Sequence, residues 1–298
     1  MPKAQANGME IEWEAIGDQG APAVLLIMGL GAQMTLWPAD LLTGLAARGL
    51  RAVRFDNRDV GLSSKMEQAG VPDLARLGMQ LMTGARVEAP YTLDDMAADA
   101  VGLLDALGIA SAHIVGASMG GMIAQLVASL HPERTLSLTS IMSTTGNPAL
   151  PHATAEANAV LMTRPTGGDV ESLVAHGLRA AKAIGSPGYP LDEAATMARI
   201  RADIARSFYP QGFARQMAAI IANGDRRPRL KTIIAPTLVI HGTDDPLVRV
   251  EGGRDTAATI SGARLVEIPG MGHDLPPALI GRIVDLIADN ALGSRAAT

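Results

Sequence analysis

The residue best placed for chemistry in this sequence is a serine in a tight glycine turn. An apolar stretch, Ala112–Val115, runs into Gly-Ala-Ser-Met-Gly at residues 116–120, and a helix-like stretch follows at once. A sharp strand-to-helix turn forces its middle residue into a strained backbone conformation, and flanking glycines remove side chains that would collide there. We therefore expect the Ser118 hydroxyl to project from the end of a strand, beside the N–H groups of a helix N-terminus.

Taken alone, G-x-S-x-G is a weak pattern, and an ordinary glycine-rich strand-to-helix turn is the alternative. Phosphate-binding loops fit less well. The sequence has no G-x-x-x-x-G-K-[ST], and Met34 stands where a dinucleotide fingerprint beginning at Gly29-x-Gly31 requires its third glycine. A cysteine nucleophile is excluded, since the chain has no Cys. A serine hydroxyl is a poor nucleophile without a base, so a base must come from elsewhere in the chain.

An acid and a base follow further along, each just after an apolar strand-like stretch. The stretch beginning at Thr237 ends in an acidic turn with Asp245, and the stretch beginning at Arg264 ends in a glycine turn with His273. Open α/β sheets place their sites beyond the carboxyl ends of their strands. The order Ser118, Asp245, His273 is also the order that a nucleophile-elbow fold requires. Together these features predict a Ser-His-Asp catalytic triad.

The elements that must position these residues alternate along the chain. Such alternation of short apolar runs with helical patterns predicts a mostly parallel central sheet with helices on both faces. The predicted strands are Met9–Ile16, Ala23–Met28, Arg51–Phe55, Ala112–Val115, Leu136–Met142, Thr237–His241 and Arg264–Ile268. The predicted helices between them are Leu41–Arg48, Leu93–Leu107 with Thr92 as its N-cap, Met119–Leu130, Gly252–Ile260 and Leu279–Ala291.

One stretch, residues 144–231, interrupts this alternation. We expect it to be a helical cap inserted into a core formed by residues 1–143 and 232–298. Extra crossover helices are the alternative. The helical patterns in it are Ala153–Met162, Val170–Ile184, Leu191–Ser207 and Gly212–Asn223. The last residues, Ser294–Thr298, are expected to fray.

The composition limits the classes of function. The 298 residues carry a net charge of −5, so no basic surface for nucleic acid is indicated. No stretch is long enough to span a membrane and no leader is visible, so we expect a cytoplasmic protein. Only 3 Phe, 3 Tyr and 2 Trp occur, against 15 Met. A core so poor in aromatic residues must consist mainly of aliphatic side chains and methionine.

These motifs together resemble the α/β-hydrolase family over essentially the whole chain. Within it, the sequence looks most like polyketide methylesterases of the aclacinomycin methylesterase type and related bacterial esterases. The matching segments are Ile27-Met-Gly-Leu-Gly, Phe55-Asp-Asn-Arg-Asp-Val-Gly-Leu-Ser, Val115-Gly-Ala-Ser-Met-Gly-Gly, His241-Gly-Thr-Asp-Asp-Pro and Pro269-Gly-Met-Gly-His. Two residues depart from the broad family pattern: Met28 replaces a common His, and Asp59 replaces the Gly of D-x-R-G-x-G-x-S.

The resemblance also implies particular roles. It places the backbone N–H groups of Leu30 and Met119 in an oxyanion hole. It favours Asp245, directly before Pro246, over Asp244 as the acid of the triad. Asp244 would then be a solvated or turn-capping carboxylate.

Four aromatic residues are candidates for substrate contact. Trp37 follows the oxyanion loop, and the insert carries Phe208, Tyr209 and Phe213. Trp37 would either wall the acyl site or pack beneath the insert. The other three would either form a hydrophobic lid over a bulky substrate or pack the insert onto the sheet.

The predicted function is hydrolysis of a small-molecule carboxylic ester through an acyl-enzyme, with methyl esters and short-chain esters as candidate substrates. Lactonase, perhydrolase, C–C hydrolase and acyltransferase chemistry stay open, as does a non-catalytic ligand-binding relative. Relatives that use Asp as nucleophile, such as haloalkane dehalogenases and epoxide hydrolases, are disfavoured by Ser118. No cofactor is expected. A metal site at His241, Asp244, Asp245 and His273 is disfavoured by their spacing.

Overall fold

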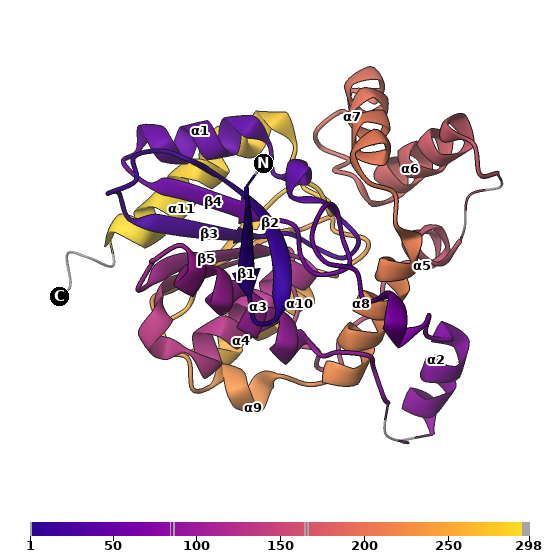
Figure 1. The fold of residues 1–298 in the computed structure, drawn as a ribbon, viewed down its shortest axis with the longest axis horizontal. Coiled ribbons are helices and arrows are strands. Elements are labelled where there is room, and N and C mark those ends of the chain that lie inside the picture. The colour runs from indigo at the N-terminus through magenta and orange to yellow at the C-terminus, as the bar shows by residue number, and fades with distance from the viewer. Residues whose placement is uncertain (1, 84, 86, 164, 166, 294–298) are drawn as a thin grey trace.

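A central eight-stranded sheet organises the protein (Figure 1), in the order β1-β2-β4-β3-β5-β6-β7-β8. The computed structural model describes residues 2–83, 85, 87–163, 165 and 167–293. Strands β3 to β8 are parallel, whereas β1 and β2 run antiparallel to their neighbours. The strands are β1 Lys3–Ala6, β2 Met9–Ile16, β3 Ala23–Ile27, β4 Arg51–Phe55, β5 Ala112–Ala117, β6 Thr135–Ile141, β7 Thr237–Gly242 and β8 Arg264–Ile268.

Strand β3 is a continuous run of apolar residues because both of its faces are buried. All five of its residues are buried, and successive side chains point to opposite faces of the sheet. Leu25 and Ile27 join one hydrophobic cluster, whereas Val24 and Leu26 join the other. A strand covered on both faces has no reason to alternate apolar with polar residues.

Helices cover both faces of the sheet. Helices α1 and α11 lie together on one face, and α3, α4 and α9 pack on the other (Figure 1). The helices are α1 Ala39–Ala47, α2 Leu74–Met82, α3 Leu93–Ala106, α4 Met119–Leu130, α5 Ala155–Met162, α6 Val170–Ile184, α7 Glu193–Arg206, α8 Pro210–Asn223, α9 Arg227–Leu230, α10 Glu251–Thr259 and α11 Ile280–Gly293. Short 3₁₀ turns lie at Met34–Leu36, Glu67–Ala69, Pro132–Arg134 and Pro277–Leu279.

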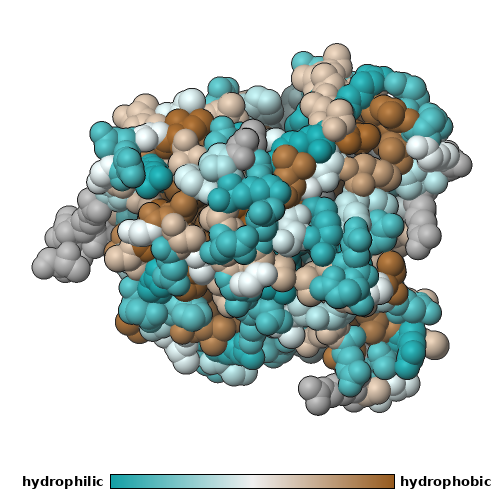
Figure 2. Space-filling model, in the orientation of Figure 1, coloured by the Kyte–Doolittle hydropathy of each residue, from teal (hydrophilic) through white to brown (hydrophobic). Residues whose placement is uncertain are grey.

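Between β6 and β7 the described residues form helices α5 to α9 and no strand. Figure 1 shows α5, α6, α7 and α8 gathered at one end of the molecule, with α2 beside them. Hydrophobic residues reach the surface among hydrophilic ones over α6 and α7 (Figure 2).

The predicted sheet is confirmed, and its strands and helices lie within a few residues of their expected ends. Thr92 caps α3 as predicted, in a capping box with Asp95. Three elements were not predicted: β1, α2 and α9. Strand β1 is a short edge strand with little buried surface, and α9 has only four residues, so neither carries a strong periodic signal. The expected fraying of Ser294–Thr298 lies outside the described residues.

Candidate active site

Ser118 lies in a strained turn between β5 and α4. Its φ of 56° is in the left-handed region, and its N–H donates to the Ile141 carbonyl over 2.9 Å. The flanking glycines are required by close contact. A Cβ on Gly116 would lie 2.0 Å from the Gly120 carbonyl oxygen, and one on Gly120 would lie 2.0 Å from that of Ile27. The motif thus has the sharp strand-to-helix turn expected from the sequence.

The serine, the histidine and one aspartate form a single hydrogen-bonded chain. Oγ of Ser118 lies 3.0 Å from Nε2 of His273, and Nδ1 of His273 lies 2.7 Å from Oδ2 of Asp245. Asp245 has no exposed surface and His273 is 8% exposed, whereas Ser118 is partly open to solvent. A hydroxyl in contact with a base, which is in turn held by an acid, is the arrangement that activates a nucleophile.

The carboxylate of Asp245 is fixed on both oxygens. Oδ1 accepts from the backbone N–H groups of Leu247 and Val248, at 2.9 and 2.8 Å, while Oδ2 faces His273. Burial by itself raises the pKa of Asp245. The electrostatic interaction with His273 and the hydrogen bonds from His241 and His273 outweigh burial, and they hold this pKa well below its usual range. Asp245 is therefore poised to stay ionised beside the imidazole.

Asp244 bonds to the backbone of Gly270 and not to His273. Its Oδ2 accepts from the Gly270 N–H over 2.8 Å, so it ties the turn after β7 to the turn after β8. The hydroxyl of Thr243 bonds to the same oxygen. The side chain thus faces a turn, as expected for a capping carboxylate, and the histidine bonds to the neighbouring residue.

The loop after β3 runs directly against the serine. A Cβ on Gly29 would lie 3.2 Å from Cβ of Ser118. Among the hydrogen bonds of the described residues, none is donated by the N–H of Leu30 or by that of Met119 at the start of α4.

Residues 56–59, after β4, hold the surrounding loops together. Asn57 donates its side-chain amide to the Met28 carbonyl over 2.8 Å. Asp56 accepts from the Met34 N–H at 2.8 Å, so both residues support the loop after β3. Their supporting role follows from contacts with distant segments, which the sequence did not reveal. Asp56 and Asn57 thus form part of a network of hydrogen bonds between loops.

The conformation and the contacts of Asp59 show what this departure from the family pattern does in the structure. Its φ is 69°, a left-handed conformation that glycine adopts without strain and aspartate does not. Its carboxylate receives two hydrogen bonds from Arg215 of α8, at 2.8 and 2.9 Å. Both side chains are almost completely buried. The ion pair thus joins the core to the helices between β6 and β7.

A second contact from those helices supports the histidine loop. The N–H of His273 donates to the carbonyl of Ile184, at the end of α6, over 2.7 Å. The N–H of Gly272 donates to the hydroxyl of Ser186 over 2.8 Å. Segments expected to form the cap therefore position the loop that carries the base.

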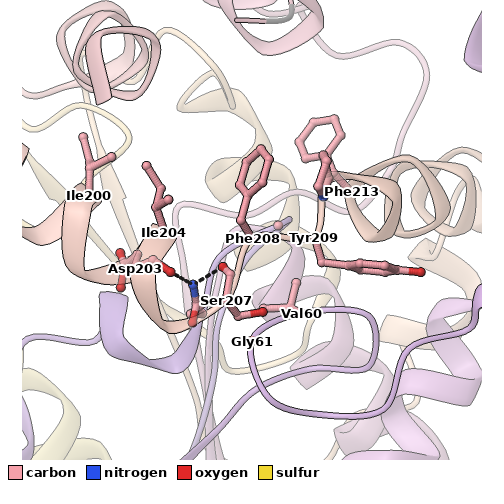
Figure 3. Close-up of a pocket in the computed structure, with 12 residues that line it drawn as sticks. Val60, Gly61, Ile200, Asp203, Ile204, Ser207, Phe208, Tyr209 and Phe213 are labelled. Carbon is pink, nitrogen blue, oxygen red and sulfur yellow. Dashed lines mark hydrogen bonds between the residues drawn. The ribbon is translucent and has the colours of Figure 1, made fainter. Parts of the chain in front are cut away.

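A pocket of about 220 Å³ lies beside the loop after β3 (Figure 3). Its apolar wall comes mainly from α7 and the start of α8, and three of the predicted aromatic residues contribute to it. In Figure 3 the side chains of Ile200, Ile204 and Phe208 extend in the same direction from this wall. The lining residues are Gly31, Gln33, Val60, Gly61, Ile200, Asp203, Ile204, Ser207, Phe208, Tyr209, Pro210 and Phe213. Ser118 is not among them, so the pocket adjoins the serine only through the loop that carries Gly29 and Gly31.

Trp37 does not contribute to this pocket. It is completely buried in the hydrophobic cluster that joins the sheet to α1 and α11. An indole enclosed by Leu41 and other core side chains presents no surface to a ligand. The structure therefore gives no support to substrate contact by Trp37.

Clusters of metal ligands and membrane-spanning helices are both missing from the described part of the chain. No group of three or more His, Asp or Glu side chains is arranged to hold a metal ion there. None of the described helices combines the length and the apolar character needed to cross a bilayer.

Comparison with known proteins places the chain in a family. A model of the alpha/beta hydrolase fold matches residues 22–276, and the chain belongs to this family. Rhodomycin D methylesterase DauP of Streptomyces sp. (strain C5) is 30% identical, with 89% of each chain covered. Rhodomycin D methylesterase DnrP of Streptomyces peucetius is 29% identical, with 94% of each covered. The crystal structure of the enol-lactonase from Burkholderia xenovorans LB400 superposes with a TM-score of 0.69 at 26% identity, covering 99% of this chain and 100% of that one.

Proposed function

We propose that this protein is a carboxylic ester hydrolase that works through a covalent ester on Ser118. The observation that carries the proposal is the contact chain from the Ser118 hydroxyl to His273 and on to Asp245, at 3.0 and 2.7 Å. The names of the relatives, two methylesterases and an enol-lactonase, support the same class of reaction.

In the first half of the reaction, Ser118 Oγ attacks the ester carbonyl carbon while Nε2 of His273 takes its proton. The tetrahedral intermediate collapses, the C–O bond to the alcohol breaks, and His273 returns the proton to the leaving alcohol. In the second half, His273 takes a proton from water as the water oxygen attacks the acyl carbon. The acid leaves and Ser118 regains its proton. Asp245 stabilises the imidazolium in both halves.

The oxyanion of each intermediate would bind the N–H groups of Leu30 and Met119. Both belong to segments that converge on Ser118, and neither donates elsewhere among the described hydrogen bonds. Loss of one such donor typically costs about 10²–10³ in kcat. Because the donors belong to the backbone, the identities of the two side chains matter little.

Substrate selection is assigned to the pocket beside Gly31. Its mixture of Ile, Phe and Tyr side chains suits an apolar group of an ester, with the cap formed by residues 144–231 supplying most of that wall. Methyl esters are the first candidates because two relatives are named methylesterases. Lactones are the second, because the structural relative is named an enol-lactonase.

The serine mechanism is tested with Ser118→Ala and a control, Ser129→Ala, which removes a hydroxyl from helix α4, the helix that follows Ser118. The first variant should lose hydrolysis of short p-nitrophenyl esters and keep its unfolding temperature, whereas the second should retain both. Mass spectrometry after fluorophosphonate treatment should find the adduct on Ser118 of the wild type. Turnover by Ser118→Ala would overturn the mechanism, and a wild type without label or turnover would favour the ligand-binding alternative.

A further inference from the structure

A buried glutamine of helix α8 connects two loops of the core. Gln216 has no exposed surface. Its Oε1 accepts from the Gly31 N–H over 2.8 Å, and its Nε2 donates to the Arg58 carbonyl over 2.8 Å. Leaving the donor or the acceptor of a buried amide without a partner costs free energy. These two hydrogen bonds therefore hold the loops that carry Gly31 and Arg58 in place relative to α8.

The hydrogen bond between Gly31 and Gln216 lies next to the peptide unit that carries the Leu30 N–H. The peptide unit that bears this N–H lies between Gly29 and Leu30. On one side of it, the Met28 carbonyl is held by Asn57. On the other side, the Gly31 N–H is held by Gln216. Within the loop, the Gly29 carbonyl of this same peptide unit accepts from the Ala32 N–H over 3.3 Å. The Leu30 N–H is therefore oriented by this local bond and by two side chains from distant segments, Asn57 and Gln216, which hold the flanking peptide units.

These flanking bonds matter because the segment is intrinsically permissive. Gly29 and Gly31 both lack a Cβ, and Gly31 has a φ of 66°, so the local sequence does not impose one conformation. Asn57 belongs to the core, and Gln216 belongs to α8. Of the two distant side chains that hold the peptide units on either side of the Leu30 N–H, one thus comes from the segment between β6 and β7.

Helix α8 is itself firmly attached at this point. Arg215 forms its buried ion pair with Asp59. A Cβ on Gly212 would lie 2.0 Å from the Asp59 carbonyl oxygen, so the helix backbone packs directly on the loop after β4. Phe213 closes on the other loop, since a Cβ on Gly31 would lie 2.9 Å from its ring. Helix α8 therefore packs directly on the loops after β3 and β4.

We infer that Gln216 is a positioning residue for the oxyanion hole: through Gly31, it orients the Leu30 N–H toward the developing negative charge. The inference rests on the oxyanion role proposed above for Leu30. The correct packing of α8 on the core is then required for the chemical step as well as for substrate binding. Gln216 itself need not touch the substrate.

The test compares Gln216→Met, which keeps the side-chain length and removes both hydrogen bonds, with Gln125→Met. Gln125 of α4 is also completely buried and also makes two side-chain hydrogen bonds, to Ser140 and Arg226, so it controls for the loss of a buried amide. Each variant is assayed for kcat, KM and unfolding temperature. Each is also assayed for inhibition by a trifluoromethyl ketone, which forms an oxyanion on the serine, and by an unreactive alcohol product.

Gln216→Met should lower kcat by about tenfold to a hundredfold and leave KM within about threefold, since an interaction made only in the transition state is weakened. Its inhibition constant for the trifluoromethyl ketone should rise by a similar factor, while that for the alcohol stays within about threefold. Gln125→Met should lower the unfolding temperature and leave both inhibition constants unchanged.

A second variant, Gln216→Glu, tests the same role if Gln216→Met does not fold. A neutral carboxylic acid can both accept from Gly31 and donate to Arg58, whereas a carboxylate can only accept and adds negative charge near the oxyanion. The activity of this variant relative to wild type should therefore rise as the pH falls.

Unchanged kcat and inhibition constants in Gln216→Met, or a flat relative pH profile in Gln216→Glu, would overturn the positioning role. If the wild type itself is active and labelled at Ser118, such a result leaves the serine mechanism intact. Failure of labelling and turnover in the wild type would instead overturn the mechanism on which this inference rests.

Discussion

Asp245 and His273 are 28 residues apart in the chain, and their side chains meet at 2.7 Å. The adjacent Asp244 points to the Gly270 N–H instead. Two neighbouring carboxylates at the end of β7 therefore have different partners within the one turn that follows β8.

This difference predicts unequal effects of removing each charge. Asp245→Asn should reduce kcat by about 10⁴, because the imidazole loses the group that holds its tautomer and stabilises its charged form. Asp244→Asn should reduce kcat by less than about tenfold. Steady-state kinetics on the same p-nitrophenyl ester measures both, and the reverse ranking would move the acid of the triad by one residue.

The low pKa of Asp245 predicts how stability depends on pH. A carboxyl whose pKa is lower in the folded than in the unfolded state stabilises the fold above its unfolded pKa, here near 3.8. That contribution is lost as the pH falls below this value toward the folded pKa. Urea unfolding of wild type and Asp245→Asn from pH 6 to pH 3 should therefore show a difference that narrows below about pH 4. A difference independent of pH would contradict the assignment.

The buried pair of Asp59 and Arg215 predicts strong coupling between two single variants. Asp59→Gly relieves the left-handed backbone but leaves a buried guanidinium unpaired, and Arg215→Met leaves a buried carboxylate unpaired. Each should lower the free energy of unfolding by about 3–5 kcal/mol. The double variant should be more stable than either single variant, since it leaves no unpaired charge. Additive losses in urea unfolding would show that the pair is not coupled.

The pocket beside Gly31 predicts a change in selectivity. Ile204 contributes to its wall from α7. Ile204→Trp should fill part of the pocket of about 220 Å³ and lower kcat/KM for esters that carry a bulky apolar group. It should leave p-nitrophenyl acetate hydrolysis within about twofold, because the change spares the serine and its partners. Equal losses for both esters would argue against this pocket as the substrate site.

Much of the proposed site was predictable because its signals are local. Ser118 and Asp245 follow apolar runs that form the buried strands β5 and β7, and His273 follows the partly buried edge strand β8. Parallel strands bring their carboxyl ends to one edge of the sheet. The glycines around Ser118 could be interpreted for the same reason, since the turn they permit involves only adjacent residues. Chain order and turn chemistry therefore sufficed to bring these three residues together.

The supporting contacts were decided only by the tertiary structure. Gln216 bonds to Gly31, 185 residues away in the chain, and Arg215 bonds to Asp59, 156 residues away. Local sequence periodicity contains no information about partners so far apart. The same holds for two of the aromatic residues: Trp37 lies in the core, whereas Phe213 lines the pocket. By itself, the sequence determined the chemistry that Ser118, Asp245 and His273 can perform. How the helices between β6 and β7 hold those residues in place depends on long-range packing, which only the folded chain creates.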